Sequence, residues 1–152
     1  MNISYVDYSI ATESLDIFFC GCNNRCVDCC NPELMSFDSG TDYAEWLPKI
    51  DEYLEKYKLL IKKVLLVGGS PNHQDPEQME LFLEGLKRRC KGIEIFMFCG
   101  EDLDEVQECF KKYCDYIKCG AYIPTLICED NTQYGIKLAT SNQKIYKKGL
   151  DY

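Results

Sequence analysis

The sequence has little histidine, little tryptophan and no long apolar run. Its 152 residues include one His and one Trp. The longest apolar runs, 64–67 and 95–99, are far shorter than the roughly 20 residues that cross a bilayer. Basic side chains are also few, since 17 Lys and Arg stand against 25 Asp and Glu and give a net charge of −8. This balance argues against non-specific binding to nucleic acid or to anionic lipid, so we expect neither a nucleic-acid partner nor a membrane partner.

Residues 1–5 lack the basic and apolar stretches of a secretion signal, so we expect a cytoplasmic protein. What the chain does have is 11 cysteines. An odd number of cysteines in a reducing compartment does not form a complete disulfide framework. The cysteines must therefore be buried apolar residues, metal ligands or reactive thiols.

Hydrophobic periodicity predicts alternating strands and helices. We expect strands at 15–19, 63–67, 93–98 and 116–118, and helices at 43–57, 76–90 and 103–113. Residues 20–37 have no period and are predicted to form a loop, and the polar segment from about 129 shows no clear pattern. Alternating elements of this kind predict an α/β fold with a mainly parallel sheet, formed as one domain over 1–152.

The predicted loop contains a C-x3-C-x2-C run made of Cys22, Cys26 and Cys29. Three thiolates this close can converge on one soft metal centre from an irregular loop, and thiolates select zinc or iron–sulfur clusters. Closed zinc sites and ordinary clusters use four protein ligands, so three ligands leave one position open. The alternative is a structural zinc site completed by a distant fourth residue. We expect Cys20 to be a buried apolar residue at the end of a strand, and Cys30 to be either a buried apolar residue or an exposed thiol.

The other cysteines and the single histidine are assigned ordinary structural roles. Cys90 and Cys109 fall on the apolar stripes of predicted helices, which indicates packing. Four further cysteines contain no C-x2-C pair and so give no second cluster: Cys99, Cys114, Cys119 and Cys128. His73 is expected to be a solvated or hydrogen-bonded loop residue rather than a proton donor.

The segment GCNNRCVDCCNPEL at 21–34 resembles the signature of radical S-adenosylmethionine enzymes, and more closely that of the activating proteins of anaerobic ribonucleoside-triphosphate reductase. In that family the three cysteines hold a 4Fe-4S cluster whose open iron binds S-adenosylmethionine. The resemblance therefore implies that Cys22, Cys26 and Cys29 are cluster ligands. It also implies the partial (β/α) barrel of these enzymes.

Two further segments extend the resemblance over about residues 15–146. Gly68, Gly69, Ser70 and Pro71 are similar to the family's glycine-glycine-acidic-proline segment, which contacts the cofactor's methionine group. Ser70 stands where the family has its acidic residue. The stretch at 141–143 is similar to a Ser-Asn-Gln motif of these activases, although surface amides in a polar segment usually contact neither a nucleoside nor a partner.

The resemblance implies an enzyme that receives an electron from flavodoxin or ferredoxin and cleaves S-adenosylmethionine. The resulting radical would be passed to a glycine in the glycyl-radical subunit of anaerobic ribonucleoside-triphosphate reductase. Two alternatives remain within the superfamily: a small-molecule enzyme of the 7-deazaguanine-forming type and an activase for another glycyl-radical enzyme. An alternative from another class is a non-enzymatic zinc or iron–sulfur binding module.

Overall fold

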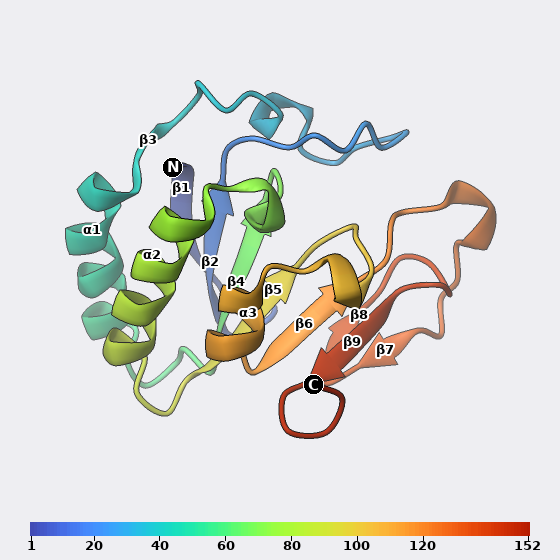
Figure 1. Cartoon of the computed structure of the whole chain (residues 1–152). Helices are drawn as coiled ribbons and strands as arrows, with labels where there is room; N and C mark the ends of the chain where they lie inside the picture. The colour runs from blue at the N-terminus through green and yellow to red at the C-terminus, as the bar shows by residue number, and fades with distance from the viewer.

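The computed structural model describes all of residues 1–152 (Figure 1). The strands are β1 (Asn2–Ser9), β2 (Ser14–Phe19), β3 (Thr41–Asp42), β4 (Lys63–Gly68), β5 (Glu94–Phe98), β6 (Tyr116–Cys119), β7 (Thr132–Gln133), β8 (Ile136–Lys137) and β9 (Lys144–Lys147). The helices are α1 (Tyr43–Lys56), α2 (Pro76–Arg89) and α3 (Glu108–Tyr113), with 3-10 turns η1 (Pro32–Leu34), η2 (Pro71–His73), η3 (Leu103–Glu105) and η4 (Pro124–Leu126). None of the helices combines the length and the apolar composition that a membrane span requires.

Seven strands form one mixed sheet in the order β3-β1-β2-β4-β5-β6-β9. The central strands β2, β4, β5 and β6 are parallel, whereas β1 and β9 pair antiparallel with the outer members of this group. The predicted α/β class is therefore confirmed. The parallel arrangement holds for the centre of the sheet, and the edges are antiparallel.

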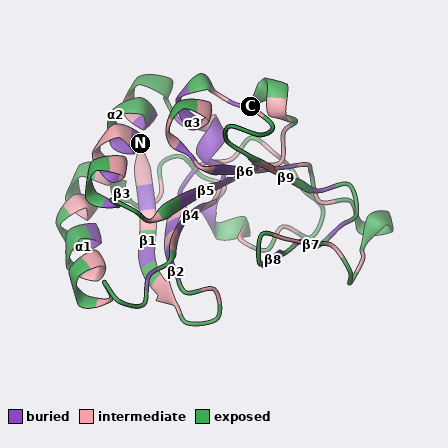
Figure 2. Ribbon diagram, turned by 90° about the horizontal axis from the view of Figure 1, so that it is seen from below, coloured by how far each residue is buried: buried purple, intermediate pink, exposed green.

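The three α-helices lie on one face of the sheet, as Figures 1 and 2 show from two directions. Their apolar residues and that face of the sheet form a core of 23 buried residues. Phe82 of α2 is central to it, since its ring makes edge contacts with Phe19 of β2 and Tyr43 of α1. Edge contacts of this kind are the arrangement that aromatic rings prefer.

The opposite face of the central strands is covered by the C-terminal segment. A second apolar cluster there joins residues of β4, β5 and β6 to residues of that segment: Leu65, Phe96, Tyr116, Ile136, Leu138 and Ile145. Covering on both faces explains why β4 and β5 are continuously apolar after their first residues, Lys63 and Glu94. The segment from 129 was predicted to have no pattern. It contains β7, β8 and β9, which are too short to show a recognisable period.

Two further regions differ from the prediction. At the edge of the sheet, strand β1 was not predicted, nor was the two-residue β3 that pairs with its first residues; β1 pairs with β2 over nearly its whole length. The helix predicted at 103–113 is divided into η3 and α3. At the division, the Gln107 N–H donates to Asn72 Oδ1 of η2 at 2.9 Å, a contact with a distant segment, instead of to a carbonyl of a preceding helical turn.

Candidate cofactor site

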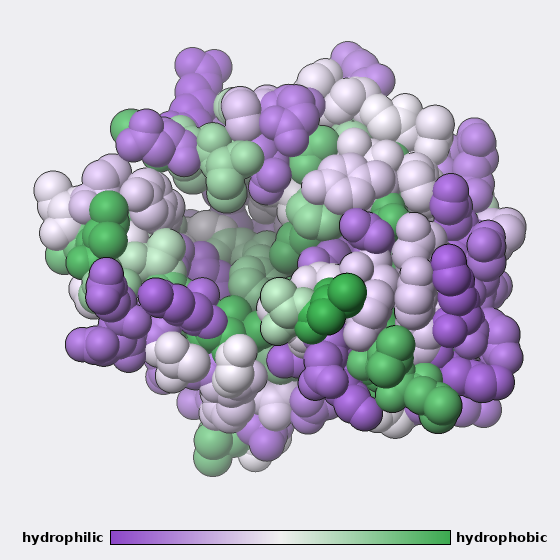
Figure 3. Space-filling view, turned by 180° about the vertical axis from the view of Figure 1, so that it is seen from behind, coloured by the Kyte–Doolittle hydropathy of each residue, from purple (hydrophilic) through white to green (hydrophobic).

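A cavity of about 540 Å³ opens at the carboxyl ends of the parallel strands. Ligands of α/β proteins bind at this edge of the sheet, and the volume lies in the range of small-molecule sites. Figure 3 shows a hollow on the face turned away from the helices, with hydrophobic residues in its depth. The lining comes from the cysteine loop, from the ends of β4, β5 and β6, and from the C-terminal segment: Cys22, Asn24, Cys26, Asp28, Cys29, Cys30, Asn31, Val67, Gly68, Gly69, Ser70, Phe98, Cys99, Gly100, Lys118, Gly120, Tyr122, Ala139 and Gln143.

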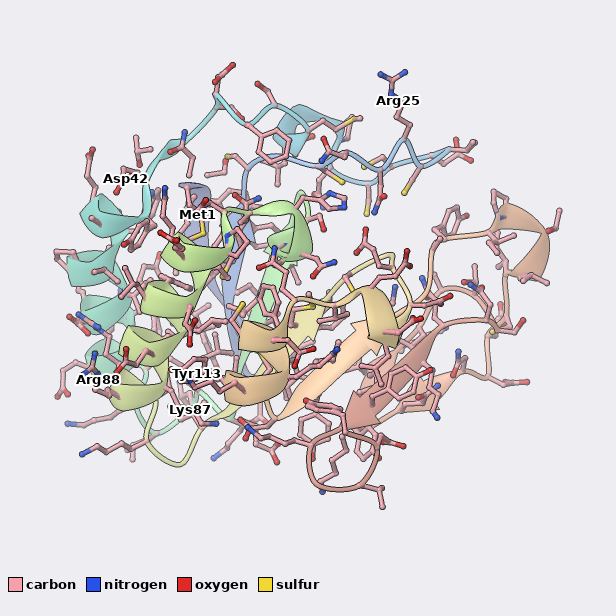
Figure 4. The ribbon with its side chains drawn as sticks, in the orientation of Figure 1. Met1, Arg25, Asp42, Lys87, Arg88 and Tyr113 are labelled. Atoms are coloured by element: carbon pink, nitrogen blue, oxygen red, sulfur yellow. The ribbon has the colours of Figure 1, made fainter.

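The cysteine loop, residues 20–37, follows β2. Hydrogen bonds between its two ends, residues 21–22 and 34–35, form what we call its neck. The Gly21 N–H donates to the Leu34 carbonyl at 2.8 Å, and the Cys22 N–H donates to the Met35 carbonyl at 3.1 Å. Figure 4 shows the loop extended above the sheet, with Arg25 projecting away from the molecule. The neck therefore holds both ends of the loop while the cysteines lie beyond it.

The predicted ligands Cys22, Cys26 and Cys29 all line this cavity, as does Cys30. Asp28 has a φ of +58°, and this left-handed residue turns the chain between the second and third cysteines. Burial raises the pKa of the Cys22 thiol above its ordinary value. In this arrangement no three or more His, Cys, Asp or Glu side chains are close enough together to hold a metal ion. The structure thus brings the thiols to one cavity without bringing them to a common point.

The glycine pair at the end of β4, Gly68 and Gly69, lies against the neck of the cysteine loop. The Gly69 N–H donates to the Phe19 carbonyl and the Ser70 N–H to the Gly21 carbonyl, both at 2.8 Å. Gly68 and Gly69 line the cavity together with Ser70, whose buried Oγ has no hydrogen-bond partner. Pro71 is buried and begins η2, outside the lining.

Gln74 makes a buried connection that sequence reasoning missed. Its carboxamide donates to the carbonyls of Cys20 at 2.9 Å, Ser70 at 3.0 Å and Gly21 at 3.3 Å. These bonds satisfy carbonyls at the point where β2 passes into the loop, so the end of β2 and the turn after β4 form one unit. No sequence motif identifies this role.

The far wall of the cavity contains residues from the ends of β5 and β6 that were not predicted. The Lys118 ammonium donates to the Gly120 carbonyl at 2.8 Å and to the Cys99 carbonyl at 3.4 Å, and burial lowers its pKa. The Cys99 thiol donates to Cys119 Sγ at 3.9 Å, and this bond lowers the pKa of Cys119. Their positions at the carboxyl ends of neighbouring parallel strands are a signal that could have located them.

Gln143 also contributes to the cavity, contrary to the expectation of a surface amide. It is buried, and its Oε1 accepts from the Ala139 N–H at 3.0 Å and from the Thr140 N–H at 3.3 Å. The Asn142 side chain, which is exposed, donates to the Ala121 carbonyl at 2.9 Å. The Ser-Asn-Gln stretch therefore fixes the turn that closes one side of the cavity.

Comparisons with known proteins agree with the cysteine spacing. The model of a family described as 4Fe-4S single cluster domain matches residues 14–145. A protein of Haemophilus influenzae named anaerobic ribonucleoside-triphosphate reductase-activating protein is 28% identical over 112 residues, which cover 70% of this chain and 72% of that protein. The resemblance to these activating proteins, inferred from the motifs, is confirmed.

Proposed function

Because this chain belongs to the family of 4Fe-4S single cluster domains, we propose that it is a radical S-adenosylmethionine activase. In this proposal Cys22, Cys26 and Cys29 ligate a 4Fe-4S cluster, and S-adenosylmethionine occupies the remaining space of the cavity. One observation carries the proposal. The three thiols and the segment from Gly68 to Ser70 line one cavity at the carboxyl ends of parallel strands.

The lining residues suit both groups. Three cysteines are the donor set that iron–sulfur clusters prefer, and they leave an iron open for a further ligand. The Ser70 hydroxyl is buried without a partner, so a bound polar group could satisfy it. The Lys118 ammonium lines the opposite wall, where it could pair with a carboxylate. The glycine pair adds no side chain that would fill the space between them.

When bound, the reduced cluster would supply the electron that splits S-adenosylmethionine into methionine and a 5′-deoxyadenosyl radical, which takes a hydrogen atom from a partner glycine. The protein's part is to orient the cofactor and to exclude water. The relative's name supports anaerobic ribonucleoside-triphosphate reductase as the partner. We propose flavodoxin or ferredoxin as the electron donor.

The same proposal treats the sheet as the partial (β/α) barrel of radical S-adenosylmethionine enzymes. Two features support it: helices cover one face of the parallel strands, and the cavity opens at their carboxyl ends. The C-terminal segment then closes the side of the cavity that a further strand and helix would close in a full barrel.

The test is cleavage of S-adenosylmethionine by the anaerobic, iron-loaded chain with a chemical reductant. We expect 5′-deoxyadenosine and methionine in equal amounts, and a glycyl radical signal once the anaerobic reductase is added. Absence of 5′-deoxyadenosine from a chain that carries its full iron and sulfide would refute the activase. Turnover of a free heterocycle without any partner protein would instead favour the small-molecule enzyme.

One observation favours a second candidate, a zinc-binding module. Cys30 lines the same cavity as the three predicted ligands, so four thiols are available, as many as a structural zinc site requires. Metal analysis of the protein as isolated separates the two functions. One zinc per chain without iron or sulfide would support the module, and iron with sulfide would support the activase.

A further inference from the structure

The only histidine of the chain forms a pair with a glutamate beside the cysteine loop. His73 lies in η2, after β4, and Glu101 follows β5. His73 Nε2 lies 2.9 Å from Glu101 Oε1, and the two side chains are 15% and 14% exposed. The pair thus joins the segments that follow two neighbouring parallel strands.

Both members of the pair also reach the cysteine loop. The backbone N–H of Asn23 donates to His73 Nδ1 at 2.9 Å, and the Asn24 carboxamide donates to Glu101 Oε1 at 2.7 Å. Because Nδ1 accepts a hydrogen bond, the proton of the neutral imidazole is on Nε2, where it is donated to Glu101. Two neighbouring residues of the loop are therefore held by one hydrogen-bonded pair.

The residues around Glu101 leave little free space beside its contact with Asn24. Gly100 makes room for it, since a Cβ added there would lie 2.9 Å from Asn24 Nδ2. The Glu101 backbone is fixed as well, because its carbonyl accepts from the Gly120 N–H at 3.1 Å. Glu101 Oε2 is buried without a partner, which makes the carboxylate costly to keep for packing alone. This cost indicates that Glu101 does more than fill space, and its two partners are Asn24 and His73.

We propose that His73 and Glu101 are positioning residues that hold the first half of the cysteine loop over the cavity. The residues they hold, Asn23 and Asn24, lie between the cysteines Cys22 and Cys26, which both line that cavity. Within the neck, hydrogen bonds hold the backbone of the loop as far as Cys22. The contacts with His73 and Glu101 hold the next two residues, Asn23 and Asn24. The importance of this for cluster assembly rests on the proposed function, but the contact itself does not.

The test compares His73→Ala and Glu101→Ala with two reference variants of the same full-length chain. Glu101→Gln keeps an acceptor oxygen for both donors. Arg25→Ala alters an exposed residue of the same loop that projects away from the molecule (Figure 4). The first measurement is hydrogen exchange of the Asn23 amide in the metal-free protein, with exchange in β5 as the internal measure of folding.

We expect the Asn23 amide to exchange about tenfold faster in His73→Ala, the change that corresponds to one hydrogen bond of about 1.4 kcal/mol. Glu101→Ala should move in the same direction, because the imidazole loses its acceptor. Glu101→Gln and Arg25→Ala should match the wild type. Unchanged exchange in both alanine variants would overturn the proposal, whatever metal the loop binds.

The second measurement is iron and sulfide per chain after anaerobic loading, together with the spectrum of the reduced cluster. We expect both alanine variants to hold less cluster or to give an altered signal, and Glu101→Gln to restore both. Faster exchange with unaltered cluster content and signal would limit the pair to a structural role and would overturn its positioning role. Absence of 5′-deoxyadenosine in all variants would count against the activase and not against this pair.

Discussion

Gly69 and Gly21 are in backbone contact: a methyl group added at Gly69 would lie 2.5 Å from the Gly21 carbonyl oxygen. The same methyl group would lie 2.8 Å from the Leu34 carbonyl oxygen, on the other side of the neck. The turn after β4 therefore lies against both ends of the cysteine loop. Neither backbone can move away cheaply, because hydrogen bonds hold them together on both sides.

Gly69→Ala should lower the free energy of unfolding by about 1–3 kcal/mol, the usual cost of inserting a methyl group into a packed site, and should reduce the iron content. Chemical denaturation and iron analysis measure the two effects. Gly85→Ala in α2 is the matched control, since its methyl group would meet only the end of the Arg89 side chain. That variant should gain about 0.5–1 kcal/mol. Equal stability of Gly69→Ala and the wild type would contradict the close contact.

Serine substitution of the loop cysteines distinguishes ligands from neighbours. We expect a large loss of cluster affinity in each of the variants Cys22→Ser, Cys26→Ser and Cys29→Ser. The loss should exceed the roughly 10–100-fold that is typical when a residue hydrogen-bonded to a metal ligand is replaced. Cys30→Ser should keep the wild-type iron and sulfide content, which is measured after anaerobic loading. A loss in Cys30→Ser as large as in the other three would assign the loop a four-thiol site.

The C-terminal segment should contribute to stability as part of the core. Ile145 of β9 is 2% exposed, and Ile145→Ala should cost about 2–5 kcal/mol in the free energy of unfolding. Lys137→Ala, at an exposed position of β8, should stay within about 0.5 kcal/mol of the wild type. Denaturant titration measures both. A small effect of Ile145→Ala would show that the segment does not pack on the sheet.

Cys90 should make stability fall at high pH. Burial raises the pKa of its thiol from 9.0 to about 12, so the folded state keeps a proton that the unfolded state releases. Its contribution is complete below pH 9 and is lost as the pH rises toward 12, with a slope of up to about 1.4 kcal/mol per pH unit. Cys90→Ala should be less stable than the wild type below pH 9, and the difference should shrink above pH 9 because its slope in denaturant titrations is flatter. Parallel slopes in the two proteins would contradict the assignment.

The central strands and the first two helices could be predicted because their apolar residues follow regular periods. The run at 64–67 ends at Gly68 and Gly69, and the stripe of α2 begins after Asp75, whose carboxylate accepts from the Gln78 N–H at 2.9 Å. Such signals are local, so they can be read along the chain. The spacing of the cysteines is local in the same way, and it led to the correct family.

The remaining features depend on contacts between distant segments. Gln143 is buried because Ala139 and Thr140 donate to it, and Gln74 because it satisfies carbonyls near Cys20. No pattern marks Gln74, and the Ser-Asn-Gln stretch singles out Gln143 without showing that its side chain is buried. Strands β7 and β8 have two residues each, which is too short for alternation to be visible. The far wall of the cavity, including Lys118, could have been anticipated only from the rule that ligands bind at the carboxyl ends of parallel strands.

The proposed activity depends on a cluster that is held by the three loop cysteines and has one iron open to S-adenosylmethionine. Electron paramagnetic resonance of the anaerobically loaded and reduced protein, recorded with and without S-adenosylmethionine, tests this directly. We expect a reduced 4Fe-4S signal whose shape changes when S-adenosylmethionine is added. A cluster signal that S-adenosylmethionine leaves unchanged, or zinc without any cluster, would contradict it.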